Sequence, residues 1–167
     1  MNFNANLTTL SAAETRITER VRAAIEYLRQ GWTAQAFLLL SEPGTEKDGA
    51  ARFALGLCHF YAGELPAAIS RFEEALNLFR SMSSKPPGRL ETSDTHTKLS
   101  IKQIDEKVYL TPMDADFCAF FPKAAEQTVL LALIDSYIQN GMIEEARRLS
   151  AGLVGPVFET FKKRMMK

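Results

Sequence analysis

The sequence has little of what metal, redox or disulfide chemistry requires. It contains two cysteines, Cys58 and Cys118, and two histidines, His59 and His96. Two cysteines are not a disulfide framework, and both lie in apolar runs, where a free cysteine packs as a small hydrophobe. His59 and Cys58 are neighbours on a predicted helix and point about 100° apart, so they cannot share a metal ion. We therefore predict no metal, no cofactor and a reducing, cytoplasmic location.

The sequence also lacks an excess of either charge and any long apolar run. Lys plus Arg and Asp plus Glu number 20 each, so the formal net charge is zero. Nucleic-acid-binding proteins carry a basic excess, and we expect no nucleic-acid partner. No run approaches the roughly 20 apolar residues of a membrane-spanning helix, and the N-terminus does not resemble a secretory signal. Because a neutral chain is weakly protected from self-association, we expect a partner or a second copy to cover part of the surface.

No catalytic group of residues is recognisable either. Cys118 and His96 form a nucleophile–base pair only if the fold brings them together. Asp114 and Asp116 fit a helix start or a turn better than a cation site, because no calcium-loop pattern follows them. No glycine-rich phosphate loop is present. We predict no catalytic residue, and an enzyme with an unrecognised site is the least favoured function.

What the sequence does contain is helical periodicity. Apolar residues recur at steps of three and four along most of the chain, and glycine or proline ends each run. This pattern predicts a single all-α domain over residues 1–167. The expected helices cover residues 11–30, 33–40, 48–62, 66–81, 122–140, 143–151 and 157–164.

Residues 81–121 depart from this pattern. The stretch 81–88 is rich in Ser and Pro and has the composition of a linker. Apolar and polar residues then alternate over 99–102 and 108–111, which predicts a short β-hairpin. An isolated hairpin is marginally stable in water, so this one is expected to lean on the helices.

A repeated unit is visible in the helical part. Three times a helix with an aromatic residue ends in glycine, and a helix with alanine follows: Tyr27…Gly31…Ala36, Tyr61…Gly63…Ala68 and Tyr137…Gly141…Ala146. The middle unit, Leu55-Gly56…Gly63…Ala68…Phe72…Ala75, resembles the tetratricopeptide repeat, with Arg52 and His59 where the family has Trp and Tyr. The resemblance implies about three stacked helical hairpins, an insert at 81–121 and a C-terminal capping helix. The alternative is an irregular helical bundle.

The resemblance also implies a concave groove, lined by the first helix of each pair, as the ligand surface. The groove residues that it places there are Arg22, Ile25, Arg29, Phe53, Leu57, Phe60, Tyr61, Leu131, Asp135 and Ile138. Their apolar floor suits an amphipathic helix or an extended apolar segment of a partner. The alternative is that these side chains are core, covered by the chain's own insert.

The implied function is a non-catalytic protein–protein interaction module, an adaptor or scaffold that binds a protein or peptide. A narrower alternative is a dedicated bacterial secretion chaperone. Chaperones related to type III secretion use about three such repeats to shield an apolar segment of one cargo protein.

Overall fold

The computed structural model describes residues 12–83, 107–151 and 156–166, and these ranges contain helices and no β-strand. The prediction of an all-α chain is confirmed. The elements are α1 (Ala12–Arg29), α2 (Thr33–Ser41), α3 (Gly49–Tyr61), α4 (Leu65–Ser83), a 3-10 turn η1 (Val108–Leu110), α6 (Ala115–Phe120), α7 (Pro122–Gln139), α8 (Ile143–Ser150) and α9 (Pro156–Met165).

Three helical pairs, α1–α2, α3–α4 and α7–α8, are joined by turns of the same geometry. Each turn has a glycine at positive φ, where a side chain would be strained: Gly31 at 79°, Gly63 at 79° and Gly141 at 76°. The N–H of the next residue donates to the carbonyl five residues back, in the bonds Trp32–Tyr27, Glu64–His59 and Met142–Tyr137. This pattern satisfies the free carbonyls at the end of each first helix.

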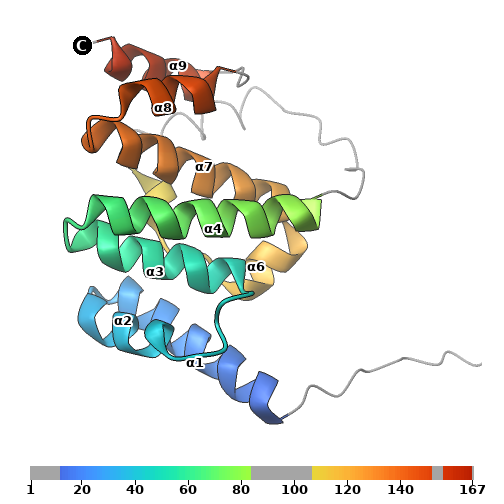
Figure 1. Cartoon of the computed structure of the whole chain (residues 1–167). Helices are drawn as coiled ribbons and strands as arrows, with labels where there is room; N and C mark the ends of the chain where they lie inside the picture. Colours follow the sequence, from blue (N-terminus) through green and yellow to red (C-terminus); the bar gives the residue numbers. More distant parts are fainter. Residues whose placement is uncertain (1–11, 84–106, 152–155, 167) are drawn as a thin grey trace, which may run out of the picture.

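The pairs stack one on the next in chain order (Figure 1). Helix α2 packs against α3, α4 packs against α7, and α9 lies beyond α8. Within the middle pair, Gly56 faces Phe72, whose ring packs on Phe53 at a centroid distance of 5.4 Å. Gly56 therefore lies at a close approach of α3 and α4.

The predicted β-hairpin is wrong for the part that the structure describes. Residues 108–110 form η1, which follows Lys107 in the left-handed region (φ 53°). A strand would bury Val108 and Leu110 on one face, but Val108 is 39% exposed while Tyr109 and Leu110 are both buried. The first predicted strand, 99–102, lies outside the described residues.

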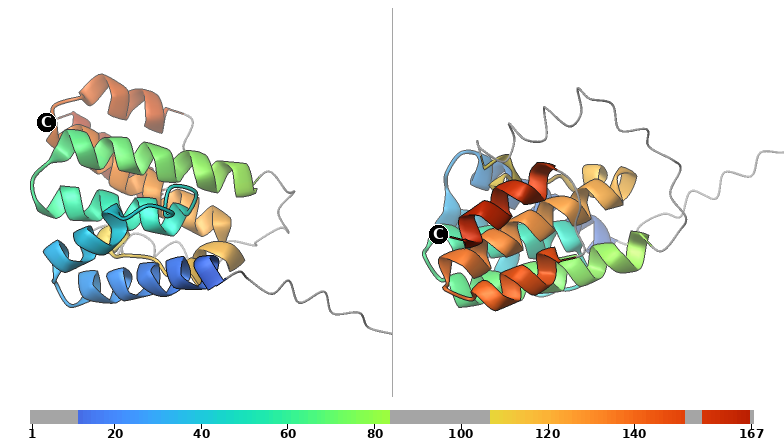
Figure 2. Two further views of the ribbon diagram at one scale, coloured as in Figure 1. Left: turned by 60° about the horizontal axis from the view of Figure 1, so that its bottom comes forward. Right: turned by 90° about the horizontal axis from the view of Figure 1, so that it is seen from above.

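Helix α6 was not predicted, because residues 115–120 were assigned to the insert. It contacts α3 and α7, and η1 contacts α7. The segment 107–121 therefore lies against the first helices of the second and third pairs, as both views of Figure 2 agree. The part of the insert that the structure describes is packed into the domain.

Candidate functional site

The predicted groove residues lie on α1, α3 and α7, and most of them are buried. Phe53, Leu57 and Asp135 have no exposed surface, and Ile25 and Leu131 are nearly as buried. The other five groove residues are Phe60 and Ile138, which are partly buried, and Arg22, Arg29 and Tyr61, which are exposed.

The segment 107–121 covers this face and bonds to it at two exposed groove residues. The Tyr61 hydroxyl donates to the Leu110 carbonyl at 2.5 Å. The Arg29 guanidinium pairs with the Asp114 carboxylate at 2.7 Å. These bonds join the segment to α3 and α1. The geometry matches the alternative in which the insert covers the apolar face, and partner binding at the ten groove residues stays a prediction.

A third attachment is made at the buried carboxylate of Asp135 on α7. It accepts hydrogen bonds from the Tyr109 hydroxyl at 2.9 Å and from Gln139 Nε2 at 3.1 Å, and it pairs with Arg164 of α9 at 2.5 Å. Burial, followed by the nearby Asp135 charge, raises the pKa of Tyr109, which keeps its hydroxyl protonated as a donor. The Tyr109 ring also meets Phe161 of α9 at 5.7 Å. The carboxylate thus ties the segment and the last helix to α7.

The pairing of Arg164 with Asp135 was not predicted from the sequence. A signal was present, because Asp135 directly follows the run Val129–Ile134. A carboxylate placed among apolar residues on one helix needs a cation when it is buried. The sequence does not indicate which Lys or Arg side chain pairs with the Asp135 carboxylate.

An apolar hollow opens between α2 and the end of α3. Its volume is about 480 Å³, and it is lined by Thr33, Ala34, Phe37, Leu38, Cys58, His59, Tyr61, Ala62 and Glu64. Leu38 is 67% exposed and Phe37 is 38% exposed. The sequence carried a signal, since Phe37 begins four consecutive apolar residues, and a helix cannot turn all four toward the core.

A second, more polar pocket of about 310 Å³ adjoins this hollow at Phe37 and His59, whose rings contact each other at a centroid distance of 5.4 Å. It shares Phe37 and His59 with the hollow and is otherwise lined by Leu40, Ser41, Glu42, Thr45, Glu46, Arg52, Leu55 and Arg71. We call the hollow and this pocket together the outer crevice.

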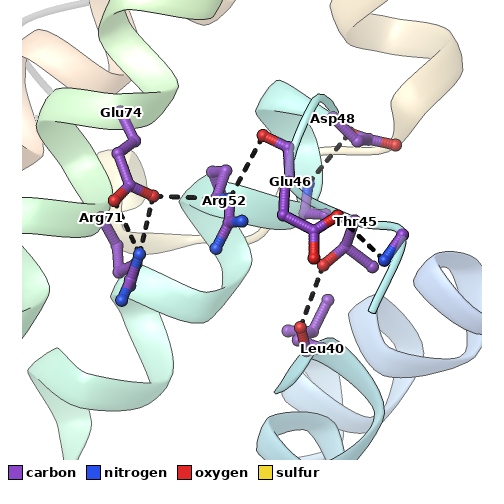
Figure 3. Close-up of polar contacts among 9 residues, drawn as sticks. Leu40, Thr45, Glu46, Asp48, Arg52, Arg71 and Glu74 are labelled. Carbon is purple, nitrogen blue, oxygen red and sulfur yellow. Dashed lines mark hydrogen bonds and ion pairs between the residues drawn. The ribbon is translucent and has the colours of Figure 1, made fainter. Parts of the chain in front are cut away.

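Arg52 and Arg71 line the polar end of the outer crevice together with Glu42 and Glu46, and both arginines contact Glu74 (Figure 3). Arg71 Nη1 donates to both oxygens of Glu74, at 2.6 and 2.8 Å. Arg52 Nε lies 3.4 Å from Glu74 and 3.4 Å from the Glu46 carbonyl. The terminal nitrogens of Arg52 have no hydrogen-bond partner within the described ranges.

The residues weighed for catalysis are not assembled into a reactive site in the described ranges. Cys58 and Cys118 are free and buried, and burial raises the pKa of each thiol to about 12, so both are neutral at pH 7. His96 lies outside the described residues. Asp114 is the N-cap residue of α6 and Asp116 lies in its first turn, which agrees with the predicted helix-start or turn role, but the Asp114 side chain makes no capping hydrogen bond and pairs with Arg29.

Neither a metal cluster nor a membrane-spanning helix is found in the part of the chain that the structure describes. No group of three or more His, Cys, Asp or Glu side chains is placed to hold a metal ion there. No helix in these ranges combines the length and the apolar character that crossing a membrane requires.

Comparison of the chain with family models, with curated proteins and with solved structures found no match in any of the three. The resemblance to the tetratricopeptide repeat therefore depends on the residues of the middle unit and stays an interpretation.

Proposed function

We propose that this chain is a non-catalytic interaction module with a tetratricopeptide-like architecture, which holds a segment of a partner protein. Two observations support the architecture. The three helical pairs share one turn geometry, with glycine at positive φ in each. Gly56 lies where the middle unit needs a close helix crossing.

The partner surface in this proposal is the outer crevice, because the concave face is covered by residues 107–121. One observation carries this assignment, the apolar hollow of about 480 Å³ beside the exposed side chain of Leu38. Trp32 and Tyr61 at the same end of α2 and α3 are each about half exposed. Gathered apolar side chains on a surface are typical of a protein-binding site.

A random-peptide phage library panned on the immobilised chain tests the proposal. We expect binding peptides that the variant Leu38→Glu no longer retains, since a charge at the hollow opposes burial of an apolar side chain. Phe120→Glu is the matched control, because Phe120 is 79% exposed on α6, away from the hollow. Circular dichroism of both variants checks that the helices persist.

The proposal fails if the library yields no binder, or if Leu38→Glu keeps the binders that Phe120→Glu loses. Identification of the full-length partner proteins then distinguishes a dedicated chaperone from an adaptor. A single stoichiometric cargo indicates a dedicated chaperone, and several partners indicate an adaptor.

A further inference from the structure

We infer that two copies of this chain pair through the exposed face of α2, so that each copy covers the apolar hollow of the other. The inference goes beyond the proposed function, because it names what covers the hollow when no partner segment is bound there. The occupant is a second copy, because this face has the residue pattern, the lack of charge and the shape that a two-fold symmetric contact requires.

Helix α2 has two faces, and the domain itself covers only one of them. Ala36 and Leu40 are buried in the core, where α2 packs against α1 and α3. Four other residues of α2 are exposed at the positions i, i+3, i+4 and i+7, and we call them the α2 stripe: Ala34, Phe37, Leu38 and Ser41. This spacing is the one along which one helix packs on another. The stripe therefore suits a helix of the occupant, and the chain itself supplies such a helix in α2.

The α2 stripe lies in a part of the chain without charge. Residues 30–41 contain no Asp, Glu, Lys or Arg, although these types make up 24% of the sequence. In a two-fold contact the residues near the axis face the same residues of the second copy, so a charge there would meet a like charge. The uncharged stripe avoids this repulsion, and the formal net charge of zero gives two copies no overall repulsion to overcome.

The charged residues nearest to the stripe have partners within their own copy. Glu42, which follows α2, pairs with Arg20 at 2.7 Å. Glu64, at the edge of the hollow, is bonded to His59 Nδ1 at 2.6 Å. A second copy that packs on the stripe therefore does not have to supply a counter-charge, which agrees with the uncharged face that it presents.

The same face carries both projecting side chains and a cavity. A contact between two identical patches requires this, because whatever projects from the patch must fit into it. A two-fold axis that crosses the middle of the stripe at right angles to α2 places Leu38 of each copy against Phe37 of the other. Both residues line the hollow of about 480 Å³, and Leu38 is 67% exposed. Ala34 and Ser41 are then opposite each other, and their small side chains let the two helices approach closely.

The antiparallel arrangement also suits the ends of α2. Helix α2 has no acidic residue in its first turn and no basic residue in its last turn. Its positive N-terminal end and its negative C-terminal end are therefore not complemented by charges of its own. Two antiparallel α2 helices place the N-terminal end of each beside the C-terminal end of the other, which is the favourable orientation of their dipoles.

The exposed aromatic residues of α6 do not meet the same conditions. Phe120 is 79% exposed, but Asp116 lies four residues before it on the same side of this short helix. A two-fold contact through α6 would bring the Asp116 carboxylates of two copies together. Position 120 is therefore the matched control for position 38, because both carry a large exposed apolar side chain and only position 38 lies on an uncharged face.

Sedimentation equilibrium of the parent chain tests the inference. We expect monomers and dimers to exchange between about 1 and about 500 µM, because a small contact face gives weak association. Leu38→Glu should raise the dissociation constant of the dimer about a hundredfold, since the change removes an apolar contact and adds a charge in both copies. Phe120→Glu should leave the dissociation constant unchanged. Circular dichroism checks that both variants keep their helices.

The variant Leu38→Cys tests the position of the axis without adding a charge. The two native cysteines are buried, so a mild oxidant reaches the thiol at position 38 first. A disulfide forms only where the two Cα atoms come within about 7 Å of each other. We expect Leu38→Cys to give a covalent dimer on a non-reducing gel, while Phe120→Cys at the same protein concentration stays monomeric.

A parent chain that remains monomeric at about 500 µM overturns the inference. A dimer that persists in Leu38→Glu, or one that Phe120→Glu abolishes, overturns it as well, because the contact then lies elsewhere. Equal cross-linking at positions 38 and 120 removes the proposed axis. The phage library decides the proposed function separately: a monomeric parent whose peptide binders are lost in Leu38→Glu overturns the pairing alone, and a dimeric parent without binders overturns the proposed function alone.

Discussion

Replacing Gly56 with alanine tests the close crossing of α3 and α4. A Cβ atom on Gly56 would lie 2.5 Å from both Cδ1 and Cε1 of Phe72 and 3.3 Å from Cβ of Arg71. Real Cβ atoms do not approach other heavy atoms as closely as 2.5 Å. The Phe72 ring is fully buried and packs on Phe53, so it has no solvent-facing direction in which to move.

The expected net effect is a difference of two terms. Overpacking in a close-packed core costs about 1–3 kcal/mol. Alanine is favoured over glycine inside a helix by about 1 kcal/mol, which offsets part of that cost. We expect Gly56→Ala to lower the free energy of unfolding by about 1 kcal/mol, or about 2–4 °C in melting temperature for a chain of this size.

Urea unfolding followed by circular dichroism measures this change. The double variant Gly56→Ala/Phe72→Leu is the control, because a smaller side chain at position 72 relieves the clash. In the Phe72→Leu background, the alanine should be neutral or stabilising, which gives a coupling free energy between the two sites. If Gly56→Ala alone is more stable than the parent, or if the coupling is zero, α3 and α4 do not cross as closely as described.

Three further predictions concern buried groups. Arg164→Gln should lower the free energy of unfolding by about 1–3 kcal/mol, because it leaves the buried Asp135 carboxylate without its cation. Adding Asp135→Asn should restore part of this loss, as measured by urea unfolding. An unchanged urea midpoint in Arg164→Gln would contradict the prediction. The pKa of Cys58 and of Cys118 is raised to about 12 in the folded chain, so the unfolded chain releases these thiol protons first as pH rises above the ordinary pKa of 9.0. The free energy of unfolding should therefore fall from pH 9 upward, and it should fall less steeply when both cysteines are replaced by alanine. Equal slopes would refute the role of the thiols. Leu57→Glu places a charge at a position with no exposed surface, so it should lower the melting temperature and speed hydrogen exchange in residues 107–118. A variant that melts like the parent would place Leu57 outside the core.

The helices of the three pairs and the turns within each pair were predictable because their signals are local. Gly31, Gly63 and Gly141 each end a periodic apolar run, and each adopts the positive φ that glycine tolerates. Such signals involve residues within one or two turns of each other.

The covering of the face formed by the predicted groove residues was decided by the tertiary structure. Residues 108–111 alternate like a strand, yet Tyr109 and Leu110 are both buried because α3 and α7 contact neighbouring parts of one turn. An alternating pattern over four residues does not distinguish a strand from a turn that is buried between two helices. Among the predicted groove residues, Arg29 bonds to Asp114 and Tyr61 bonds to the Leu110 carbonyl, and neither partner carries a periodic signal in the sequence.

Long-range polar contacts were decided in the same way. Asp135 bonds to Tyr109, 26 residues before it, and to Arg164, 29 residues after it. The sequence by itself determined that an acid follows an apolar run, and hence that it needs a partner if it is buried. The stacking of the helical pairs decides which side chains bond to the Asp135 carboxylate. It also decides which apolar face stays open between α2 and α3, because each helix has several faces and only packing selects the one that is covered.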